Sequence, residues 1–295
     1  IVELSPDVTS YINLDGAANY GNYRIASVAK VGSDYGMLMS DSWIKTDEKT
    51  GKPVVGYTNK FRTVYYKRGG TVKEVGSMLP NFLGSLNSTL RWKDLSLYVL
   101  FDARFGGYVA SYNSRYATAY GFSGETEKYR KGMTWTSKYA NAQDKVFTDG
   151  FIPDVVFDAG TIVTTPGGTN QDVSGMTYQE AYEKGYVEPA HLQSAAYFKN
   201  SWGTGVINDD WFKKINYIAL REITLSYNVP TKISSYIGAK NLSLSFTGRN
   251  LAYLLNTAPN HENPESVRGT GAAQFRMRSF MPYTASYLFT LNATF

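Results

Sequence analysis

The chain has 295 residues, of which 43% are hydrophobic and 15% aromatic, with no Cys and a formal net charge of +5. The lack of Cys excludes disulfides, thiolate metal sites and cysteine catalysis. The basic residues are scattered, and because a phosphate track needs clustered cations, nucleic-acid binding is not expected. No apolar run approaches the roughly 18 residues that a membrane helix needs, so a helical membrane span is excluded.

Residues 1–80 contain only weak structural signals. Tyr11–Leu14, Tyr23–Val31 and Phe61–Tyr66 each have the composition of a short strand, and the sequence DEKTGKP at Asp47–Pro53 predicts a turn. No repeat of fixed period, heptad or low-complexity tract stands out. We therefore expect short strands here, in no particular topology.

Two segments with alternating polarity follow. Successive side chains of a strand point to opposite faces, so each segment predicts a strand with one apolar and one polar face. Lys93 and Asp94 separate the two segments and predict a tight turn between them. The apolar faces consist of Phe82, Leu86, Leu90 and Trp92 in the first strand, and Leu95, Leu97, Val99, Phe101, Ala103 and Phe105 in the second.

A long segment, residues 106–212, separates this hairpin from the next predicted strand. Its rings are interleaved with Ser, Asn, Asp and Gln, and aromatic faces beside polar groups suit sugars or peptides. Alternatively, the rings pack within the segment or against a partner. A loop of this length is usually functional, so we expect the segment as a whole to contact a ligand or a partner. The candidate contact residues are Tyr112, Tyr116, Trp135, Tyr197 and Trp202.

Three more alternating segments complete the chain. A short link, Pro230–Lys240, joins the third and fourth strands, and the longer segment 252–282 separates the fourth from the fifth. Leu288 is the one apolar residue on the polar face of the terminal strand. The apolar faces consist of Ile223, Leu225, Tyr227 and Val229; of Leu242, Leu244 and Phe246; and of Tyr283, Ala285, Tyr287, Phe289, Leu291, Ala293 and Phe295.

The connections therefore alternate between short and long. Transmembrane barrels of the outer membrane have short periplasmic turns, long outer loops and strands of about ten residues, apolar towards lipid. A soluble sandwich has no need of this asymmetry. The pattern favours an all-β fold, a transmembrane antiparallel β-barrel with long outer loops at about 106–212 and 252–282. The alternative is a surface β-sandwich that binds carbohydrate without transport.

Arg221 conflicts with this pattern, because its position has the parity of the lipid-facing residues of the third strand. An Arg facing lipid costs about 2–4 kcal/mol at the bilayer midplane and less near the headgroups. Two explanations stay open. The guanidinium could reach lipid phosphate near the outer headgroups, or a bulge could shift the parity and turn the side chain inward.

Candidate catalytic and metal-binding residues are few. Asp154, Asp158 and the pair Asp209–Asp210 are the carboxylates that could serve a glycan-degrading enzyme, but nothing fixes their separation. His191 and His261 lack metal-ligand spacing, and both are predicted to be surface residues. We therefore expect no enzyme activity, no metal and no cofactor.

Several motifs occur in the order expected of one family. The chain resembles the carboxyl-terminal part of the SusC/RagA-type TonB-dependent transporters of Bacteroidetes outer membranes. The loop sequence HENPE at His261–Glu265 departs from the family's GyDPE motif and keeps only its last two residues. The motifs that carry the resemblance are VGSDYG at Val31–Gly36, VGSMLPNFLGSLNSTLRWKDL, LSLYVLFDARFGG at Leu95–Gly107, INYIALREITLSYNVP at Ile215–Pro230 and LSLSFTGRNL at Leu242–Leu251.

The resemblance implies a barrel of about 22 strands with a plugged lumen. Residues 1–295 would then be the carboxyl-terminal part of one barrel domain, and their strands would pair with an amino-terminal part that is not in this chain. The implied function is TonB-dependent import of a glycan or peptide nutrient across the bacterial outer membrane. The implied partners are a SusD-like surface lipoprotein, TonB through a segment absent here, outer-membrane lipid, and the barrel-assembly machinery, which would recognise Phe295.

Overall fold

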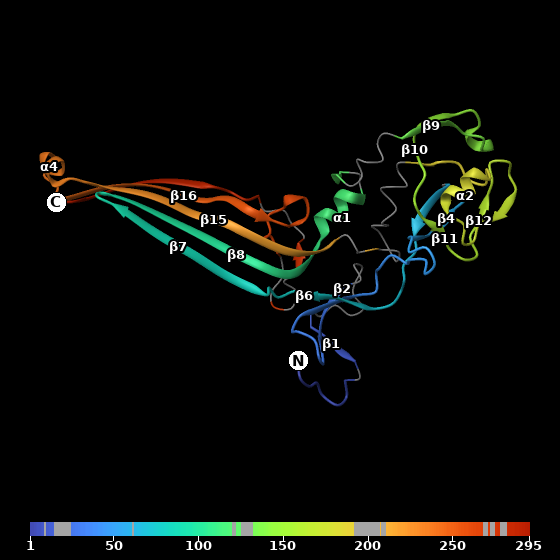
Figure 1. Ribbon diagram of the computed structural model, residues 1–295, viewed down its shortest axis with the longest axis horizontal. Coiled ribbons are helices and arrows are strands. Elements are labelled where there is room, and N and C mark those ends of the chain that lie inside the picture. Colours follow the sequence, from blue (N-terminus) through green and yellow to red (C-terminus); the bar gives the residue numbers. More distant parts are fainter. Residues whose placement is uncertain are drawn as a thin grey trace. The chain divides into compact units, whose positions relative to one another are not determined.

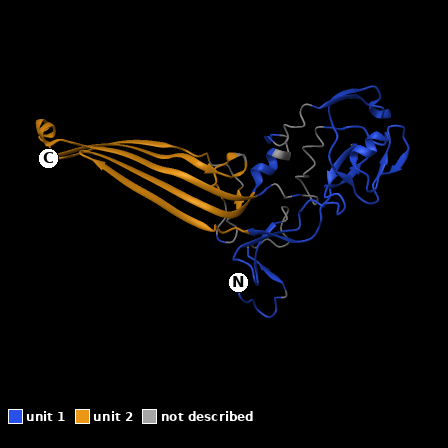
Figure 2. Cartoon of the chain, in the orientation of Figure 1, with its two compact units in different colours: residues 1–76, 111–212, 271–273 blue, residues 77–110, 213–270, 274–295 orange. Residues whose placement is uncertain are grey.

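The computed structural model describes residues 1–8, 10–14, 25–60, 62–119, 122–124, 132–191, 207, 211–267, 271, 275–277 and 282–295. The chain divides into two compact units (Figure 2). The first comprises residues 1–76, 111–212 and 271–273, and the second comprises residues 77–110, 213–270 and 274–295. In the part of the chain that is described, no helix is both long and apolar enough to cross a membrane.

The second unit is a six-stranded sheet whose long strands run side by side (Figure 1). Its strands follow the order β17-β8-β15-β16-β18, and β7 also pairs with β8. The described sheets do not close into a barrel, so the structure supports the all-β class and leaves barrel closure as a prediction. The strands are β7 (Phe82–Trp92), β8 (Leu95–Ser111), β15 (Phe212–Val229), β16 (Asn241–Asn256), β17 (Arg276–Met277) and β18 (Ser286–Thr294).

The pairing register gives this sheet one apolar and one polar face. Residues that lie directly opposite each other in neighbouring strands share a face. Leu225, Phe246 and Phe289 form one apolar row across β15, β16 and β18. The next row, made of Ser226, Ser245 and Thr290, is polar. In the β7–β8 hairpin, likewise, apolar and largely polar pairs alternate. The faces predicted from the alternation are confirmed here.

All five predicted strands are present, but β8, β15 and β16 continue beyond the alternating segments. β8 passes through Gly106 and Gly107, whose φ angles of 88° and 84° suit glycine. β16 passes through Asn250 at φ 52°, and its register with β15 shifts twice. Each irregularity interrupts the alternation of faces without ending the strand. The extended ends of β8 and β15 contribute to a buried cluster of Val109, Ile215, Tyr217, Ala219, Ala258 and Met277.

The terminal strand is shorter than the sequence predicts. It begins at Ser286, and Tyr283 precedes it. The ring centroid of Tyr283 lies 4.5 Å from that of Tyr253, so Tyr283 packs against a residue of β16 instead of continuing the apolar row. Phe295 is 72% exposed at the end of the chain, and its carbonyl oxygen accepts a hydrogen bond from Lys240 Nζ at 3.2 Å.

Short turns connect the strands as predicted. The β7–β8 turn consists of Lys93 and Asp94, with Lys93 in a left-handed conformation (φ 52°). The link between β15 and β16 forms the short helix α4 (Thr231–Ser234) and the 3-10 turn η5 (Ser235–Ile237). The 3-10 turn η6 (Pro259–His261) follows β16.

The first unit is built from small sheets. β1, β2, β3 and β6 form one, β11, β4 and β5 a second, and β14, β10 and β9 a third, while β12 and β13 form a hairpin. The strands predicted near residues 11, 25 and 63 are confirmed. The elements are β1 (Tyr11–Asn13), β2 (Ile25–Lys30), β3 (Met37–Ser40), β4 (Val54–Thr58), β5 (Thr63–Tyr66), β6 (Lys73–Ser77), α1 (Tyr112–Ala119), β9 (Met133–Thr136), η3 (Ala140–Ala142), β10 (Val146–Phe151), β11 (Val156–Phe157), β12 (Ile162–Thr164), β13 (Asn170–Asp172), α2 (Tyr178–Glu183) and β14 (Ala190–His191).

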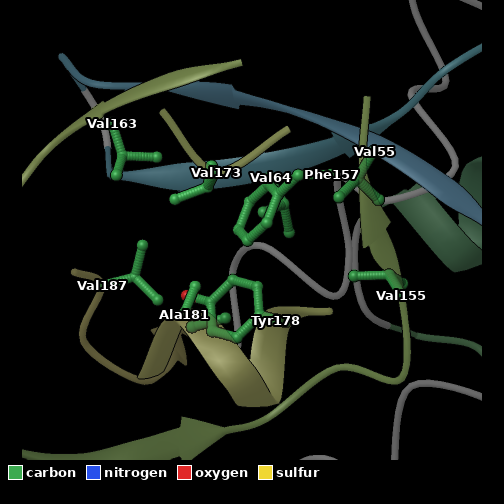
Figure 3. Close-up of a cluster of buried hydrophobic side chains, with 10 residues drawn as sticks. Val55, Val64, Val155, Phe157, Val163, Val173, Tyr178, Ala181 and Val187 are labelled. Atoms are coloured by element: carbon green, nitrogen blue, oxygen red, sulfur yellow. The ribbon is translucent and has the colours of Figure 1, made fainter. Parts of the chain in front are cut away.

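The core of the first unit joins distant parts of the chain. β11 pairs in parallel with β4, placing Val156 opposite Val54. The helix α2 lies below these strands, and the rings of Phe157 and Tyr178 stack with their centroids 5.5 Å apart (Figure 3). Residues 106–212, predicted as a long loop, therefore contribute to a packed core with residues of β4 and β5. Its buried members are Val55, Val64, Val155, Phe157, Val163, Val173, Tyr178, Ala181, Val187 and Ala190.

Candidate functional site

Trp135, one of the predicted contact residues, lies in a cluster of rings in the first unit. β10 pairs with β9 and with β14, which brings together Trp135 of β9, Phe147 of β10 and His191 of β14. The centroid of the Trp135 ring lies 5.0 Å from that of Phe147 and 4.9 Å from that of His191. Gly150 makes room for the indole, because a Cβ there would lie 2.6 Å from an indole carbon.

His191 is not a simple surface residue, in contrast to the prediction. Its side chain is 23% exposed, and its Nδ1 lies 3.2 Å from Oδ1 of Asp149. Its ring also packs edge-on against Phe147, with centroids 4.6 Å apart. The residue therefore belongs to the ring cluster. Among the described residues no group of His, Cys, Asp and Glu is arranged to hold a metal ion.

Glu188 connects the ring cluster to a neighbouring loop. Its Oε2 accepts hydrogen bonds from Trp135 Nε1 at 3.2 Å and from Ser137 Oγ at 2.8 Å. Its Oε1 accepts from the backbone N–H of Lys138 at 2.5 Å. Three donors therefore fix the carboxylate, and this arrangement also fixes the orientation of the indole.

A shallow cleft lies beside this carboxylate, too closely packed to admit a water-sized sphere. Tyr57 Oη and Tyr139 Oη lie 3.4 Å apart, and the guanidinium carbon of Arg62 lies 4.8 Å from the centroid of the Tyr139 ring. Burial raises the pKa of both tyrosines, so their hydroxyls stay protonated at neutral pH. The lining residues are Tyr57, Arg62, Tyr139, Glu188, Pro189 and His191.

Neither Trp135 nor any other described residue among the predicted contacts lines this cleft. Tyr112 is the first residue of α1 and is 4% exposed, so its ring packs within the protein. Tyr116 lies one turn further along α1, half-buried. Tyr197 and Trp202 lie outside the described residues. A ligand or partner role for all five predicted residues, Trp135 included, stays a prediction.

The candidate catalytic carboxylates are engaged in ion pairs with lysines. Asp158 accepts from Lys45 Nζ at 2.7 Å and lies 3.5 Å from Lys67 Nζ. Burial opposes ionisation of Asp158, but the two lysines outweigh it and lower its pKa. Asp154 pairs with Lys52 at 2.7 Å. Asp209 and Asp210 lie outside the described residues.

Arg221, in the second unit, is turned to the polar face of the sheet. The register between β15 and β16 shifts between Leu220 and Glu222, so Arg221 lies at an irregularity in the strand. Its Nη2 lies 2.9 Å from Asp102 Oδ2 and 2.6 Å from Glu265 Oε1. Asp102 pairs with Ser85 on the polar face of the β7–β8 hairpin. The structure therefore supports the bulge and removes the lipid-phosphate explanation.

Sequence comparisons give no assignment: no protein-family model matches the chain, and no curated protein matches it. Solved structures do match. The chain aligns over 100% of its length with 25% of a chain in the structure of the RagAB peptide importer in the open-open state, with 13% identity and a TM-score of 0.50.

Two related structures also match this chain. A structure of the RagAB peptide transporter matches 100% of it with 12% identity and a TM-score of 0.49, covering 25% of that chain. The closed-closed state of the importer matches 93% of it with 12% identity and a TM-score of 0.46, covering 24% of that chain. The chain thus spans about a quarter of the length of these proteins, and the first match shows a shared fold.

Proposed function

We propose that this chain forms part of the wall of an outer-membrane nutrient importer. The observation that carries the proposal is the two-faced sheet of the second unit, whose apolar face is open. Leu86 is 69% exposed and Phe289 is 67% exposed, although both belong to apolar rows. Exposed apolar patches of this kind mark membrane or protein contacts.

A β-sandwich is less compatible with this geometry. Its second sheet would cover the apolar face and form a core about 10 Å thick. Among the described residues no second sheet pairs with this unit, and the exposed apolar side chains extend from β7 to β18. A lipid bilayer satisfies the same face without a second sheet, provided that every strand edge is paired. We therefore prefer the transmembrane wall to the surface sandwich that binds carbohydrate.

The fold shared with the open-open RagAB structure supports a transport role, since that protein is a peptide importer. The sequence motifs support the same family. The proposed cargo is a peptide or a glycan, delivered by a SusD-like surface lipoprotein and drawn through the barrel by TonB acting on a plug. This chain would contribute strands, outer loops and ligand contacts, and we propose no covalent chemistry for it.

A spin-label experiment tests the membrane wall. Because the chain has no Cys, Phe289→Cys and Thr290→Cys each introduce a single thiol into it. The two positions are adjacent in β18 and lie on opposite faces of the sheet. With the protein in liposomes, a label at 289 should collide more often with oxygen, which dissolves in lipid, than with a water-soluble nickel chelate. A label at 290 should show the opposite preference.

The adjacent pair controls for differences in depth and local structure. If both labels were equally accessible to the nickel chelate, neither face would meet lipid and the importer wall would be refuted. If both labels were shielded from oxygen and nickel alike, a protein-covered sandwich would be favoured instead.

A further inference from the structure

The link between β15 and β16, Pro230–Lys240, has an exposed apolar side. Tyr236 and Ile237 follow Ile233 by three and four positions, so the three side chains share one side of the turn that α4 and η5 form. Tyr236 is 90% exposed, and both isoleucines are more than half exposed. Single exposed apolar residues are common on protein surfaces, but three that share one side mark a contact.

The shape of this link is fixed by its backbone. The N–H of Ile233 donates to the carbonyl of Pro230 at 2.8 Å, and the N–H of Ala239 donates to that of Ser234 at 3.1 Å. Gly238 ends η5 in a left-handed conformation, with φ 74°. Ser234 and Ala239 are both buried. An ordered turn therefore presents the three apolar side chains.

The charges beside the apolar side of the link are basic. Residues 230–240 contain two lysines and no acidic residue. Lys240 Nζ donates to the carbonyl oxygen of Phe295 at 3.2 Å, whereas Lys232 is exposed and forms no ion pair with a described residue. At about 100° per residue, Lys232 flanks the apolar side and Ser235 lies opposite it. Segments that lie at a bilayer surface combine an apolar side with flanking cations in this way.

Two more exposed rings lie at the same end of the sheet. The N–H of Asn228 donates to the carbonyl of Asp94 at 2.9 Å, which ties the β7–β8 turn to β15 just before the link. The end of the chain lies there too (Figure 1). Trp92 is 68% exposed and Phe295 72% exposed. Aromatic side chains collect where a bilayer meets water.

Basic side chains outnumber acidic ones at this end. The β7–β8 turn and the residues beside it contribute Arg91, Lys93 and Asp94, and the link contributes Lys232 and Lys240. Lysine and arginine side chains near a membrane surface are attracted to anionic lipid. Charge complementarity therefore favours an anionic phospholipid as the occupant.

The link also continues the apolar face of the sheet. Val229 pairs with Leu242, and Leu242 pairs with Ala293, so the last apolar row of β15, β16 and β18 directly precedes the link. β15 and β16 each have a strand on both sides. Strands that joined the sheet at its edges would therefore leave the link uncovered. A bilayer against the apolar face would reach the link without a break.

We propose that this link lies in the lipid headgroup layer and anchors the wall there. Ile233, Tyr236 and Ile237 insert beside the upper acyl carbons, and Lys232 binds the phosphate of an anionic phospholipid. The inference rests on the proposed function, because it assumes a bilayer around the sheet. The short turns are periplasmic in that topology, so the lipid belongs to the periplasmic leaflet.

Fluorescence quenching in liposomes tests the contact. Tyr236→Cys and Ser235→Cys each introduce one thiol for a fluorophore, at adjacent exposed positions on different sides of the link. Lipids with a nitroxide high on one acyl chain quench a fluorophore that lies among them. Iodide, added on both sides of the membrane, quenches from water. The label at 236 should be quenched mainly by lipid and the label at 235 mainly by iodide.

The label at 236 also tests the charge of the headgroup. The liposomes contain equal parts of phosphatidylcholine and phosphatidylglycerol, with the nitroxide on one lipid or on the other. Phosphatidylglycerol should quench more strongly. Lys232→Gln should lower the local excess of phosphatidylglycerol about fivefold, since each lysine near an anionic surface contributes to the attraction. Lys49→Gln, the same change in an exposed turn of the first unit, should leave this excess unchanged.

Each other outcome overturns the proposal. Equal quenching of the labels at 235 and 236, by iodide or by lipid, overturns the one-sided contact. Shielding of both labels from lipid and iodide would mean that a protein covers the link. Equal quenching by the two lipids overturns the anionic headgroup, as does an excess of phosphatidylglycerol that survives in Lys232→Gln. The comparison between the two labels does not depend on how Lys232→Gln folds.

The result is distinguishable from failure of the importer proposal. The spin-label test at positions 289 and 290 concerns the sheet alone. A label at 289 in lipid, combined with a label at 236 in water, would overturn only the anchor. A label at 236 in lipid without lipid contact at 289 would refute the wall, and the link would then bind the surface of a membrane that the sheet does not span.

Discussion

Arg221 and Glu265 form a bidentate ion pair, with Nη1 2.9 Å from Oε2 and Nη2 2.6 Å from Oε1. Glu265 follows β16 in the chain, whereas Arg221 belongs to β15. The same guanidinium contacts Asp102 of β8 at 2.9 Å, and Tyr253 Oη donates to Glu265 Oε2 at 2.8 Å. One arginine therefore ties the segment after β16 to two strands of the sheet.

Arg221→Met should release that segment. The change leaves Asp102 and Glu265 near each other without their cation, and the Arg221 side chain is only 19% exposed. Glu265 is 40% exposed and partly screened, so we expect a loss of about 1–3 kcal/mol in local stability. Hydrogen exchange of the Glu265 and Ser266 amides, which both bond to Asn263, measures it.

Arg249→Met is the matched control for this change. Arg249 pairs with Glu222 at 2.9 Å, but its side chain is 58% exposed, so its removal should cost less than about 1 kcal/mol. A double-mutant cycle that combines Arg221→Met with Glu265→Met isolates the interaction between these two residues. A coupling energy near zero would show that Arg221 and Glu265 act independently.

The ion pair should also respond to acid. Burial opposes ionisation of Glu265, but hydrogen bonds from Arg221 and Tyr253 outweigh it and lower the pKa below the ordinary value of 4.5. Because the pKa of Glu265 is lower in the folded than in the unfolded protein, its ionised form stabilises the fold at any pH above the unfolded-state pKa. This contribution is lost as the pH falls through the folded-state pKa. Exchange at Ser266, corrected for its intrinsic pH dependence, should therefore accelerate only below pH 4.5. In Glu265→Gln this acceleration at low pH should be absent. If the variant showed an acceleration of the same size, the titrating group would be another residue.

The sheet was largely predictable because it is half exposed. A strand with one apolar and one polar face shows its period directly in the sequence, and the rows through Phe246 and Ser245 follow it. Alternation could not predict where strands continue past an irregularity. The unfavourable parity of Arg221 was itself the signal of a bulge, but its partner Glu265 could not be identified, because 44 residues separate the two.

The first unit was less predictable, for a physical reason. Its described strands have only two to six residues, too few to show a period, and Val55 meets Phe157 across a long separation in sequence. The contact role predicted for Trp135 stays a prediction, and Arg62 and Glu188, which line the cleft, come together only through tertiary pairing. One local signal was readable: Thr177 and Glu180 form a capping box that starts α2, the T-x-x-E pattern.

Gly107→Ala should destabilise the second unit. Gly107 has φ 84°, and a Cβ there would lie 2.7 Å from the carbonyl oxygen of Met78. A left-handed alanine alone costs about 1–2 kcal/mol, and the clash with backbone adds to it. Gly238→Ala is the control, because Gly238 has φ 74° and open space around it. Urea unfolding in detergent should show a larger fall in midpoint for Gly107→Ala, and equal midpoints would mean that the strand shifts at no cost.

Phe157→Ala should destabilise the first unit by about 3–5 kcal/mol, because it removes a ring from the centre of the core and leaves a cavity. Phe157 is 1% exposed and stacks on Tyr178. The amide of Asp158 reports on this core, since it donates to the carbonyl of Val55 at 2.8 Å and so bridges the two parts of the chain. Its hydrogen exchange should accelerate strongly in Phe157→Ala. In Val146→Ala, where the side chain is 61% exposed, it should change little. Unchanged exchange in Phe157→Ala would mean that β4 and β11 hold together without the ring, and the core would then rest on the valines around it.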